Sequence, residues 1–460
     1  MYPPRQLYEW ILLLFLMTAF TLNLFNFIWA EIPTNKNSLT HISEIELKDQ
    51  NFDSDLILEY LFAPAENFIS PHLIDIEINQ SFCHRSKCKF LFMYKTIERK
   101  FDDEFNAQRH FQMFINFTRQ LNRIMVLPNV GESHISVCGK HSFKFYYSIE
   151  NLKEMYPDVS FMLQSDFLRW TKERYIKPSV IQTTIIERRG NGKHSLQPQL
   201  VDVEDLKDRN CLREFNFDYE TVESNIITLE GKYWDTPDHL KETNEFMINN
   251  MMSDVEVILF DHNLNFNNYV QEKTEPIKYS NSVMKKVSDI FDHLDPYIAI
   301  HWKMEQGEQK NMVMCAEGLI REIKKLKSRH NILNIYLATD YPLRNNLKQF
   351  YSFQNITRHH DKAIKTLKRK IKFKSWLSFN PQDPNGRNIG YKSFAESGIP
   401  GIIDKLVCTR AKIFLTAPPS CKNINSDYSK DIIQGREKLL EENENEEFIN
   451  TVTQWAVYKN

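Results

Sequence analysis

Glycine is scarce in this chain, with 12 residues among 460, and there is no excess of charge of either sign. The low glycine content excludes collagen and glycine-rich low-complexity chains. Lysine and arginine number 58 and aspartate and glutamate 60, a formal net charge of −2. Nucleic-acid-binding proteins usually carry a basic face, so this balance argues against a nucleic-acid partner. The chain is 42% hydrophobic and 13% aromatic, which indicates folded cores and excludes disorder.

Long apolar runs are also few, and the one clear example lies near the N-terminus. Residues 11–30, ILLLFLMTAFTLNLFNFIWA, contain no charge. A helix of that length spans about 30 Å, the thickness of the hydrocarbon core of a bilayer. Because the apolar part of a cleaved signal peptide is usually only about 7–15 residues long, we expect an uncleaved transmembrane signal anchor. A cleaved signal peptide, with Ala30 before the cut, is the alternative.

Cysteines and glycosylation sequons agree with a secretory route. The chain has seven cysteines, and Cys83 and Cys88 stand close enough in CHRSKC to close a small disulfide loop. A zinc site would need a second pair at similar spacing, which the sequence lacks. N-x-S/T sequons at Asn79, Asn116 and Asn355 give mild support. We therefore expect a glycoprotein of the endoplasmic reticulum or Golgi membrane, single-pass and type II, with most of the chain in the lumen.

The order of apolar runs predicts an α/β fold with two domains. In the first half, short strand-like runs lie on either side of a helical pattern, and a βαβ unit of this size implies a parallel sheet. A polar region at about 188–250 separates the halves. The expected strands of the first half are 89–96, 123–128, 159–162 and 180–187, and the helix is 106–121.

The second half alternates more regularly and predicts a doubly wound domain. Its expected strands are 297–301, 334–338, 376–379 and 411–415, with helices at 315–327, 362–374 and 399–409 and another running to 440. The predicted organisation is a cytoplasmic N-terminus (1–10), the anchor (11–30), a stem (31–84), an N-terminal Rossmann-like domain (85–255) and a C-terminal Rossmann-like domain (256–460).

Polar residues directly follow three of these strands, and in open parallel sheets ligands bind at the carboxyl ends of the strands. They are His301 to Glu305, then Thr339 and Asp340, and finally Ser420, Ser426, Ser429 and Arg436. A helix that begins near Ser426 offers free N–H groups to an anion. Lys303 and Arg436 would neutralise a diphosphate, and Asp340 would accept hydrogen bonds from a base or ribose. The pattern therefore predicts a nucleotide-diphosphate site.

Several segments resemble the GDP-fucose protein O-fucosyltransferase family, in particular a fungal branch of it. YIAIHWKME resembles the family's HWR segment, and NIYLATDYP its strand ending in ATD. GIIDKLVCTRAKIFLTAPPSCKNINSDYSKDIIQGRE resembles the C-terminal motif, which has a helix with Asp and Cys, a strand, a Ser/Thr-Phe-Ser group and a trailing Arg. FNAQRHF and LNRIMVLPNVG are similar to the amino-terminal motif. The resemblance covers about residues 85–455.

This resemblance implies a GT-B architecture, two Rossmann-like domains that face a cleft. It also implies inverting transfer of fucose from GDP-fucose to Ser or Thr of a protein acceptor, with no metal and no cofactor besides the donor. By this resemblance, Lys303 takes the place of the family's arginine, which contacts the β-phosphate and the leaving oxygen, and His301 lies beside the sugar-nucleotide. Asp340 lies near the nucleoside, and Ser426, Tyr428 and Ser429 contact the phosphates. Arg436 matches the trailing arginine, and Asn106 and Gln108 match the loop that closes on the donor.

Two departures from the family pattern leave an alternative interpretation open. Lys303 keeps the charge of the family's arginine but loses the fork that holds two oxygens at once. Residues 103–106 are DEFN where the family has glycines, and carboxylates there would repel a diphosphate if they faced it. The alternatives are a weakened or inactive lumenal binding protein on the same fold, and an α/β protein with an unrelated ligand. Glu305 and Glu104 are the two candidates for the general base.

Overall fold

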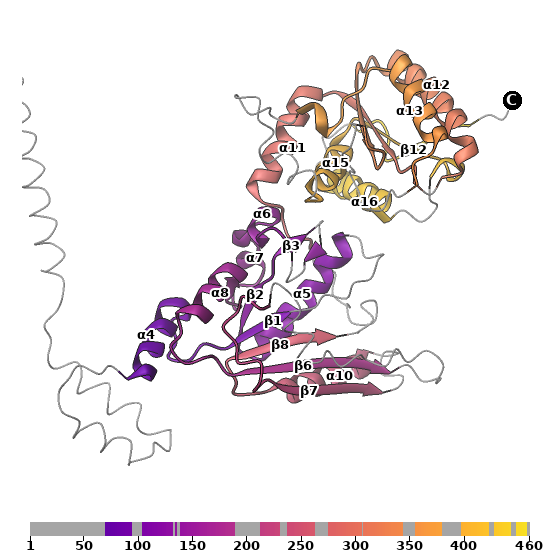
Figure 1. Ribbon diagram of the computed structural model, residues 1–460. Helices are drawn as coiled ribbons and strands as arrows, with labels where there is room; N and C mark the ends of the chain where they lie inside the picture. Colours follow the sequence, from indigo (N-terminus) through magenta and orange to yellow (C-terminus); the bar gives the residue numbers. More distant parts are fainter. Residues whose placement is uncertain are drawn as a thin grey trace, which may run out of the picture. The chain divides into compact units, whose positions relative to one another are not determined.

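The computed structural model describes most of the chain from Ser70 onward (Figure 1), and Ser70–Asn460 is one compact unit. The described residues are 70–93, 104–131, 134–135, 139–188, 212–230, 237–262, 275–305, 307–343, 355–379, 397–422, 427–442 and 448–457. The predicted anchor and residues 31–69 of the predicted stem lie outside them, whereas residues 71–83, also expected to be stem, form helix α4 (Pro71–Cys83). Among these residues, no helix has both the length and the apolar character needed to cross a membrane.

The first sheet has six strands in the order β5-β2-β1-β8-β6-β7, and every neighbouring pair is parallel. Its strands are β1 (Phe90–Met93), β2 (Ile124–Leu127), β5 (Phe161–Leu163), β6 (Val180–Arg188), β7 (Glu223–Glu230) and β8 (Val257–His262). The helices of this part are α4 (Pro71–Cys83), α5 (Glu104–Gln120), α6 (Phe143–Tyr146), α7 (Ile149–Met155), α8 (Gln164–Glu173) and α10 (Pro237–Met251). Strands β3 (Val130–Gly131) and β4 (His134–Ile135) form a separate antiparallel pair.

The second sheet has four parallel strands in the order β10-β9-β11-β12. They are β9 (Tyr297–Trp302), β10 (Asn334–Thr339), β11 (Ile413–Thr416) and β12 (Thr453–Gln454). Its helices are α11 (Asn281–Leu294), α12 (Met312–His330), α13 (Arg358–Lys370), α15 (Ile399–Arg410) and α16 (Asp427–Glu442). Short 3₁₀ turns are η2 (Gln309–Asn311), η3 (Trp376–Phe379) and η4 (Pro419–Cys421). The predicted α/β class with parallel sheets is confirmed.

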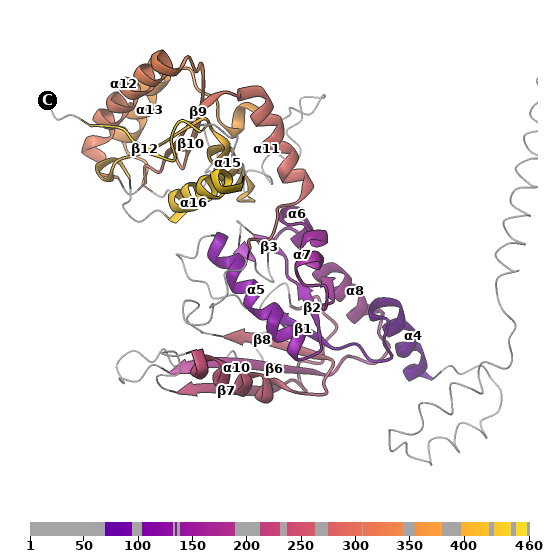
Figure 2. The same ribbon diagram turned by 180° about the vertical axis from the view of Figure 1, so that it is seen from behind.

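Alternation along β9 explains why this sheet has helices on both faces. Successive side chains of a strand point to opposite faces. Tyr297 and Ala299 join the buried cluster that includes α11, α15 and α16, whereas Ile298 and Ile300 join the cluster formed with α12 and α13. Figure 2 shows α12 and α13 side by side, and α15 beside α16. His301 therefore falls on the α15 and α16 face of the strand, where the site described below is built.

Three expectations about elements differ from the structure. The region 188–250, expected to separate the halves, contains β7 and α10, and β7 pairs with β6 along its whole length. Strand β8, which lies beyond the expected boundary at 255, pairs with β1 and β6 of the first sheet. The run 376–379 forms a 3₁₀ turn, not a strand. The domain boundaries themselves stay a prediction.

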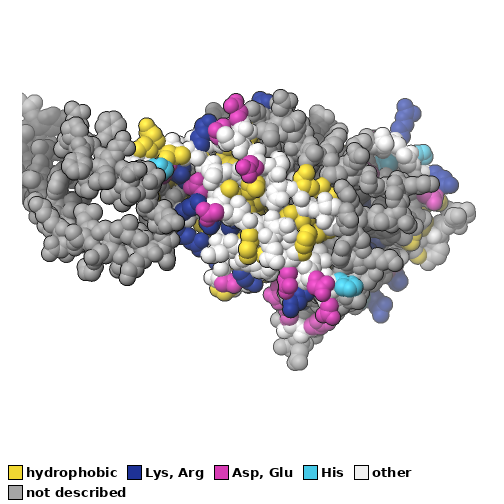
Figure 3. Space-filling view, turned by 90° about the horizontal axis from the view of Figure 1, so that it is seen from below, with side chains coloured by type: hydrophobic (Ala, Val, Ile, Leu, Met, Phe, Trp, Pro, Cys, Tyr) yellow, Lys and Arg dark blue, Asp and Glu magenta, His cyan; other side chains and the backbone are white. Residues whose placement is uncertain are grey.

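The surface around α10 and β7 shows an ordinary mixture of side chains. Ile226 of β7 is 42% exposed and Phe246 of α10 is 48% exposed. Figure 3, which views the molecule from the side where these elements lie in Figure 1, shows apolar groups separated by polar and charged ones. Single exposed apolar side chains of this kind are normal on soluble proteins. We therefore assign no binding role to this face.

Two disulfides stabilise the described fold. Cys83 and Cys88 form the small loop that their spacing predicts, and Cys315 of α12 bonds Cys421 of η4 across 106 positions of sequence. Among the described cysteines Cys408 is free, and it is buried. Disulfides of this kind persist in oxidising compartments.

The double substitution Cys315→Ala and Cys421→Ala is expected to lower the free energy of unfolding by about 2–5 kcal/mol, because a bridge that closes about 100 residues restricts the unfolded chain strongly. Removing the bridge between Cys83 and Cys88, which closes only a few residues, is the matched control. The same restriction of the unfolded chain predicts that its loss lowers the free energy of unfolding by about 2 kcal/mol. Urea unfolding of both variants measures the difference. A larger cost for the short loop would contradict the prediction.

Candidate functional site

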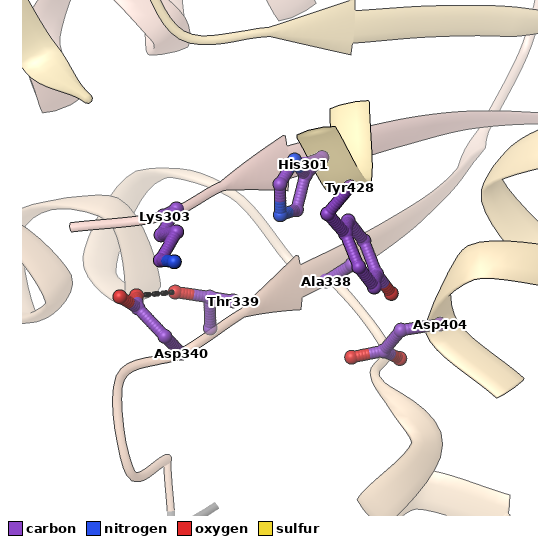
Figure 4. A pocket seen from close by; sticks show the side chains of 7 residues that line it. All are labelled: His301, Lys303, Ala338, Thr339, Asp340, Asp404 and Tyr428. Atoms are coloured by element: carbon purple, nitrogen blue, oxygen red, sulfur yellow. Dashed lines mark hydrogen bonds between the residues drawn. The ribbon is translucent and has the colours of Figure 1, made fainter. Parts of the chain in front are cut away.

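The carboxyl ends of β9 and β10 meet helices α15 and α16 around a hollow (Figure 4). The hollow has an empty volume of about 420 Å³, which includes solvent on its open side. Charged and polar side chains from separate segments converge here, as the rule for open parallel sheets predicts. The lining residues are His301, Lys303, Ala338, Thr339, Asp340, Asp404 and Tyr428.

His301 is held by the first turn of α16. Its Nδ1 lies 2.9 Å from the hydroxyl of Ser429 in a hydrogen bond, and its ring lies 4.6 Å from the ring of Tyr428. The Tyr428 hydroxyl in turn donates to the carbonyl of Gly401 in α15, at 2.5 Å. Three residues predicted for the site, His301, Tyr428 and Ser429, therefore come together, although His301 lies more than a hundred positions before the other two in sequence.

The environment of His301 keeps its imidazole neutral. Burial lowers the pKa of His301 to about 3, and the positive charges of Lys303 and Lys422 act in the same direction. A neutral imidazole offers one donor and one acceptor but no charge. Any charge needed to hold an anion here must therefore come from other residues.

This low pKa predicts a loss of stability in acid. The unfolded chain takes up a proton on this imidazole near pH 6.5, whereas the folded chain resists protonation until about pH 3. The contribution of His301 is therefore fully present above about pH 6.5 and is lost as the pH falls, by at most about 1.4 kcal/mol per pH unit. Urea unfolding at pH 7 and pH 5.5 should show a smaller decline for His301→Asn than for the wild type. The exposed His359→Gln variant is the control, and an equal decline in all three proteins would contradict the prediction.

Asp340 is tied to the backbone that follows β9. Its carboxylate accepts the N–H groups of Met304 at 2.7 Å and Glu305 at 2.9 Å. Burial raises the pKa of Asp340 to about 6, while these hydrogen bonds and the charge of Lys303 oppose the increase. The carboxylate is thus mostly ionised at neutral pH and fixes the segment that carries Lys303. This positioning role was not foreseen from the motif, which suggested contact with a nucleoside.

Lys303 provides the cation of the hollow. Figure 4 shows its side chain close to Thr339 and Asp340. Within the described part of the chain, no hydrogen bond or ion pair to its ammonium group is found, and the side chain is only partly buried. The next carboxylate along the chain is Glu305, whose Oε2 is buried without a hydrogen-bond partner in the described structure, but Glu305 does not line the hollow.

Asp404 of α15 is a lining residue that sequence reasoning missed. Its carboxyl accepts a hydrogen bond from the hydroxyl of Tyr336, and burial raises the pKa of Asp404 well above its usual value, although this hydrogen bond opposes the increase. The residue sits among Ile402, Ile403 and Val407 on the inner face of a helix. An acidic residue on that apolar face was the available signal, because a buried carboxyl needs a partner or a function.

The structure does not bring Gln108 to this hollow. Gln108 is buried, donates to Glu104 at 2.5 Å and accepts the N–H of Ile277 at 2.9 Å. Glu104 also accepts from Tyr279 at 2.7 Å and pairs with Lys405 at 2.5 Å. Burial alone would raise the pKa of Glu104, but the charge of Lys405 and the hydrogen bonds outweigh it and lower that pKa. The carboxylate expected to repel a diphosphate is therefore neutralised by a lysine.

Arg436 likewise bonds to other parts of the protein and does not line the hollow. It is fully buried in α16, and its guanidinium donates to five main-chain carbonyls. These belong to Cys408, Thr409, Ala411, Asn450 and Thr451, at 2.6–3.2 Å.

The structure thus gives Arg436 a role in joining α15 to the final strand, not in the hollow. Ser426 lies outside the described residues, and so does the side chain of Asn106. In the part of the chain that is described, no three His, Cys, Asp or Glu side chains gather as metal ligands.

Sequence comparison gives a family match, and structure comparison gives distant neighbours. The model of the family described as GDP-fucose protein O-fucosyltransferase matches residues 104–426. No curated protein sequence matches the chain significantly.

Among solved structures, POFUT1 in its apo form is 11% identical with a TM-score of 0.41, covering 81% of this chain and 98% of that one. POFUT1 in complex with GDP-fucose is 10% identical with the same coverage and a TM-score of 0.41. NodZ alpha-1,6-fucosyltransferase co-crystallised with GDP is 11% identical with a TM-score of 0.33, covering 75% and 92%. The sequence match, which spans most of the chain, decides the family.

Proposed function

Because this chain belongs to the GDP-fucose protein O-fucosyltransferase family, we propose that it transfers fucose from GDP-fucose to Ser or Thr of a protein acceptor, with inversion and without a metal ion. The observation that carries the proposal is the hollow at the ends of β9 and β10, where Lys303 points a cation into the space expected for a diphosphate. The start of α16 adds backbone N–H groups at the same place.

The reaction breaks the bond between the anomeric carbon of fucose and the β-phosphate oxygen. The electron pair stays on that oxygen, and Lys303 stabilises the charge that develops there. The acceptor hydroxyl attacks the opposite face of the oxocarbenium-like sugar, forms the new carbon–oxygen bond and gives its proton to a general base. Neutral His301, hydrogen-bonded to Ser429, would orient the donor through its remaining ring nitrogen.

Of the two carboxylates considered as general base, Glu305 is the better candidate. Glu104 is saturated by Lys405, Tyr279, Tyr147 and Gln108, and a carboxylate stabilised in its charged form is a weak base. Glu305 has a buried oxygen without a hydrogen-bond partner among the described residues. We keep Glu305 in this role as a proposal.

We also propose a GT-B arrangement, an N-terminal signal anchor and a type II orientation that exposes the site to the lumen of the endoplasmic reticulum or Golgi. The two disulfides support an oxidising compartment, and the charge-free run at residues 11–30 supports the anchor. Asn106, Ser426 and the domain boundaries keep their predicted roles as part of the same proposal.

A lumenal binding protein on the same fold is the second candidate, and the lysine at position 303 favours it. A lysine binds phosphate as a point charge and lacks the fork of arginine. Release of GDP from GDP-fucose, measured for the wild type and for Lys303→Arg, distinguishes the transferase from the binding protein. GDP release that rises strongly with arginine supports a weakened enzyme. Binding of GDP-fucose without release by either protein supports the binding role and overturns the proposed transfer.

A further inference from the structure

Lys422 lies at the point where the strand order of the second sheet reverses. The chain moves from β9 to β10 on one side and then returns across β9 to β11, so the neighbouring strands β9 and β11 flank the reversal. Ligands of open α/β sheets bind at this switch point, outside the carboxyl ends. His301 is the penultimate residue of β9 and pairs in register with Thr416, which ends β11. The Nζ of Lys422 donates to the Thr416 hydroxyl at 3.1 Å.

The segment that carries Lys422 is firmly anchored to β9. The carbonyl of the preceding residue, Cys421, accepts the indole N–H of Trp302 at 3.0 Å, and Cys421 is bonded to Cys315 of α12. Gly307 packs so closely on this segment that an added Cβ would lie 2.8 Å from the Cys421 carbonyl oxygen. The position of Lys422 is therefore set by the fold and does not depend on a ligand.

The charges around the switch point are unbalanced. Lys303 and Lys422 both act on His301, and burial lowers the pKa of Lys422 itself. His301 stays neutral and adds no compensating charge, and the carboxylate of Asp340 is engaged with the backbone of Met304 and Glu305. Two positive charges that both act on the same buried imidazole favour an anion with more than one charge.

We propose that Lys422 is a second phosphate-binding residue of the donor site, which holds the diphosphate of the nucleotide-sugar together with Lys303. The inference rests on the proposed function and adds a residue to that same site. Lys303 follows β9 and Lys422 follows η4, so two lysines from separate segments can each bind a different phosphate oxygen. Together they would make the two contacts that a single forked guanidinium makes. The sequence departure at position 303 is thereby compensated within the chain.

Calorimetric titration of the full chain in detergent micelles with guanosine, GMP and GDP tests this inference. Lys422→Gln is expected to weaken GDP binding about 10- to 100-fold, the usual effect of losing a charge-assisted hydrogen bond, while guanosine binding changes by less than about twofold. Lys422→Arg keeps the charge and is expected to bind GDP within about threefold of the wild type. Lys324→Gln, an exposed lysine of α12, is the matched control and is expected to behave as wild type.

The outcomes separate this inference from the function on which it rests. If the wild type binds GDP and Lys422→Gln binds it equally tightly, the role of Lys422 is overturned and the proposed function stays intact. Equal weakening of guanosine and GDP, or an arginine variant as weak as the glutamine variant, shows a structural role and also overturns it. Failure of the folded wild type to bind GDP overturns the proposed function itself.

Discussion

Replacing Lys303 by glutamine is expected to lower kcat/KM for release of GDP from GDP-fucose by about 10²–10³-fold. The substitution keeps a side chain of similar length and removes the cation that lines the hollow. Charge develops on the leaving diphosphate in the transition state, and removing one donor aimed at such charge usually has an effect of this size. A coupled assay of GDP release, with water as the acceptor, measures the change.

Two variants make this prediction specific. Lys303→Arg keeps the charge and is expected to match or exceed the wild type, because a guanidinium holds two phosphate oxygens. Lys324→Gln removes an exposed charge from α12 and is expected to leave the rate unchanged. A wild-type rate that survives in Lys303→Gln would contradict the assignment of Lys303 to the donor phosphates.

Replacing Arg174 by methionine is expected to lower the free energy of unfolding by about 3–5 kcal/mol, since breaking a buried ion pair leaves uncompensated charge in the interior. Arg174 follows α8 and lies between two buried carboxylates, 3.1 Å from Asp75 of α4 and 2.5 Å from Glu256 before β8. Its guanidinium also lies 5.2 Å from the centre of the Trp170 ring. Urea unfolding of the variant measures the loss.

Arg169, which lies within α8, provides the matched control. It pairs with Asp166 and Glu173, each at 3.6 Å, but its side chain is 62% exposed. Exposed pairs of this kind contribute under about 1 kcal/mol, so Arg169→Met is expected to have little effect. Equal losses in the two methionine variants would contradict the view that the buried network ties α4 and α8 to the first sheet.

Buried strands are the elements that could be predicted from the sequence. Strands β9, β10 and β11 are nearly continuous apolar runs, because both faces of a parallel sheet are covered. Strand β7, ESNIITLE, was missed because it is an edge strand with alternating polar residues in a polar region. Residues 376–379 were predicted as a strand, but Lys374 already pairs with β10 through its own backbone, and the chain then turns.

The site could be predicted only where residue type and position on a strand coincide. His301 and Asp340 lie at strand ends, so the rule for parallel sheets located them near one another. Arg436 and Gln108 have suitable chemistry, but the structure uses their donors on carbonyls and on Glu104. Hydrogen bonds to partners that are distant in sequence cannot be predicted from the residues around each donor. Lys422 was missed for the opposite reason, because only the strand register brings it beside His301.

Calorimetric titration of the full chain with GDP-fucose, GDP and UDP-glucose tests the central claim most directly, namely that the hollow at the end of the second sheet is a GDP-fucose site. We predict binding of GDP-fucose and GDP with a Kd on the order of micromolar, about −8 kcal/mol, and at least about 100-fold weaker binding of UDP-glucose. The tight binding should be lost in Lys303→Gln. Absence of binding by any of the three nucleotides, in a sample shown to be folded, would contradict the claim.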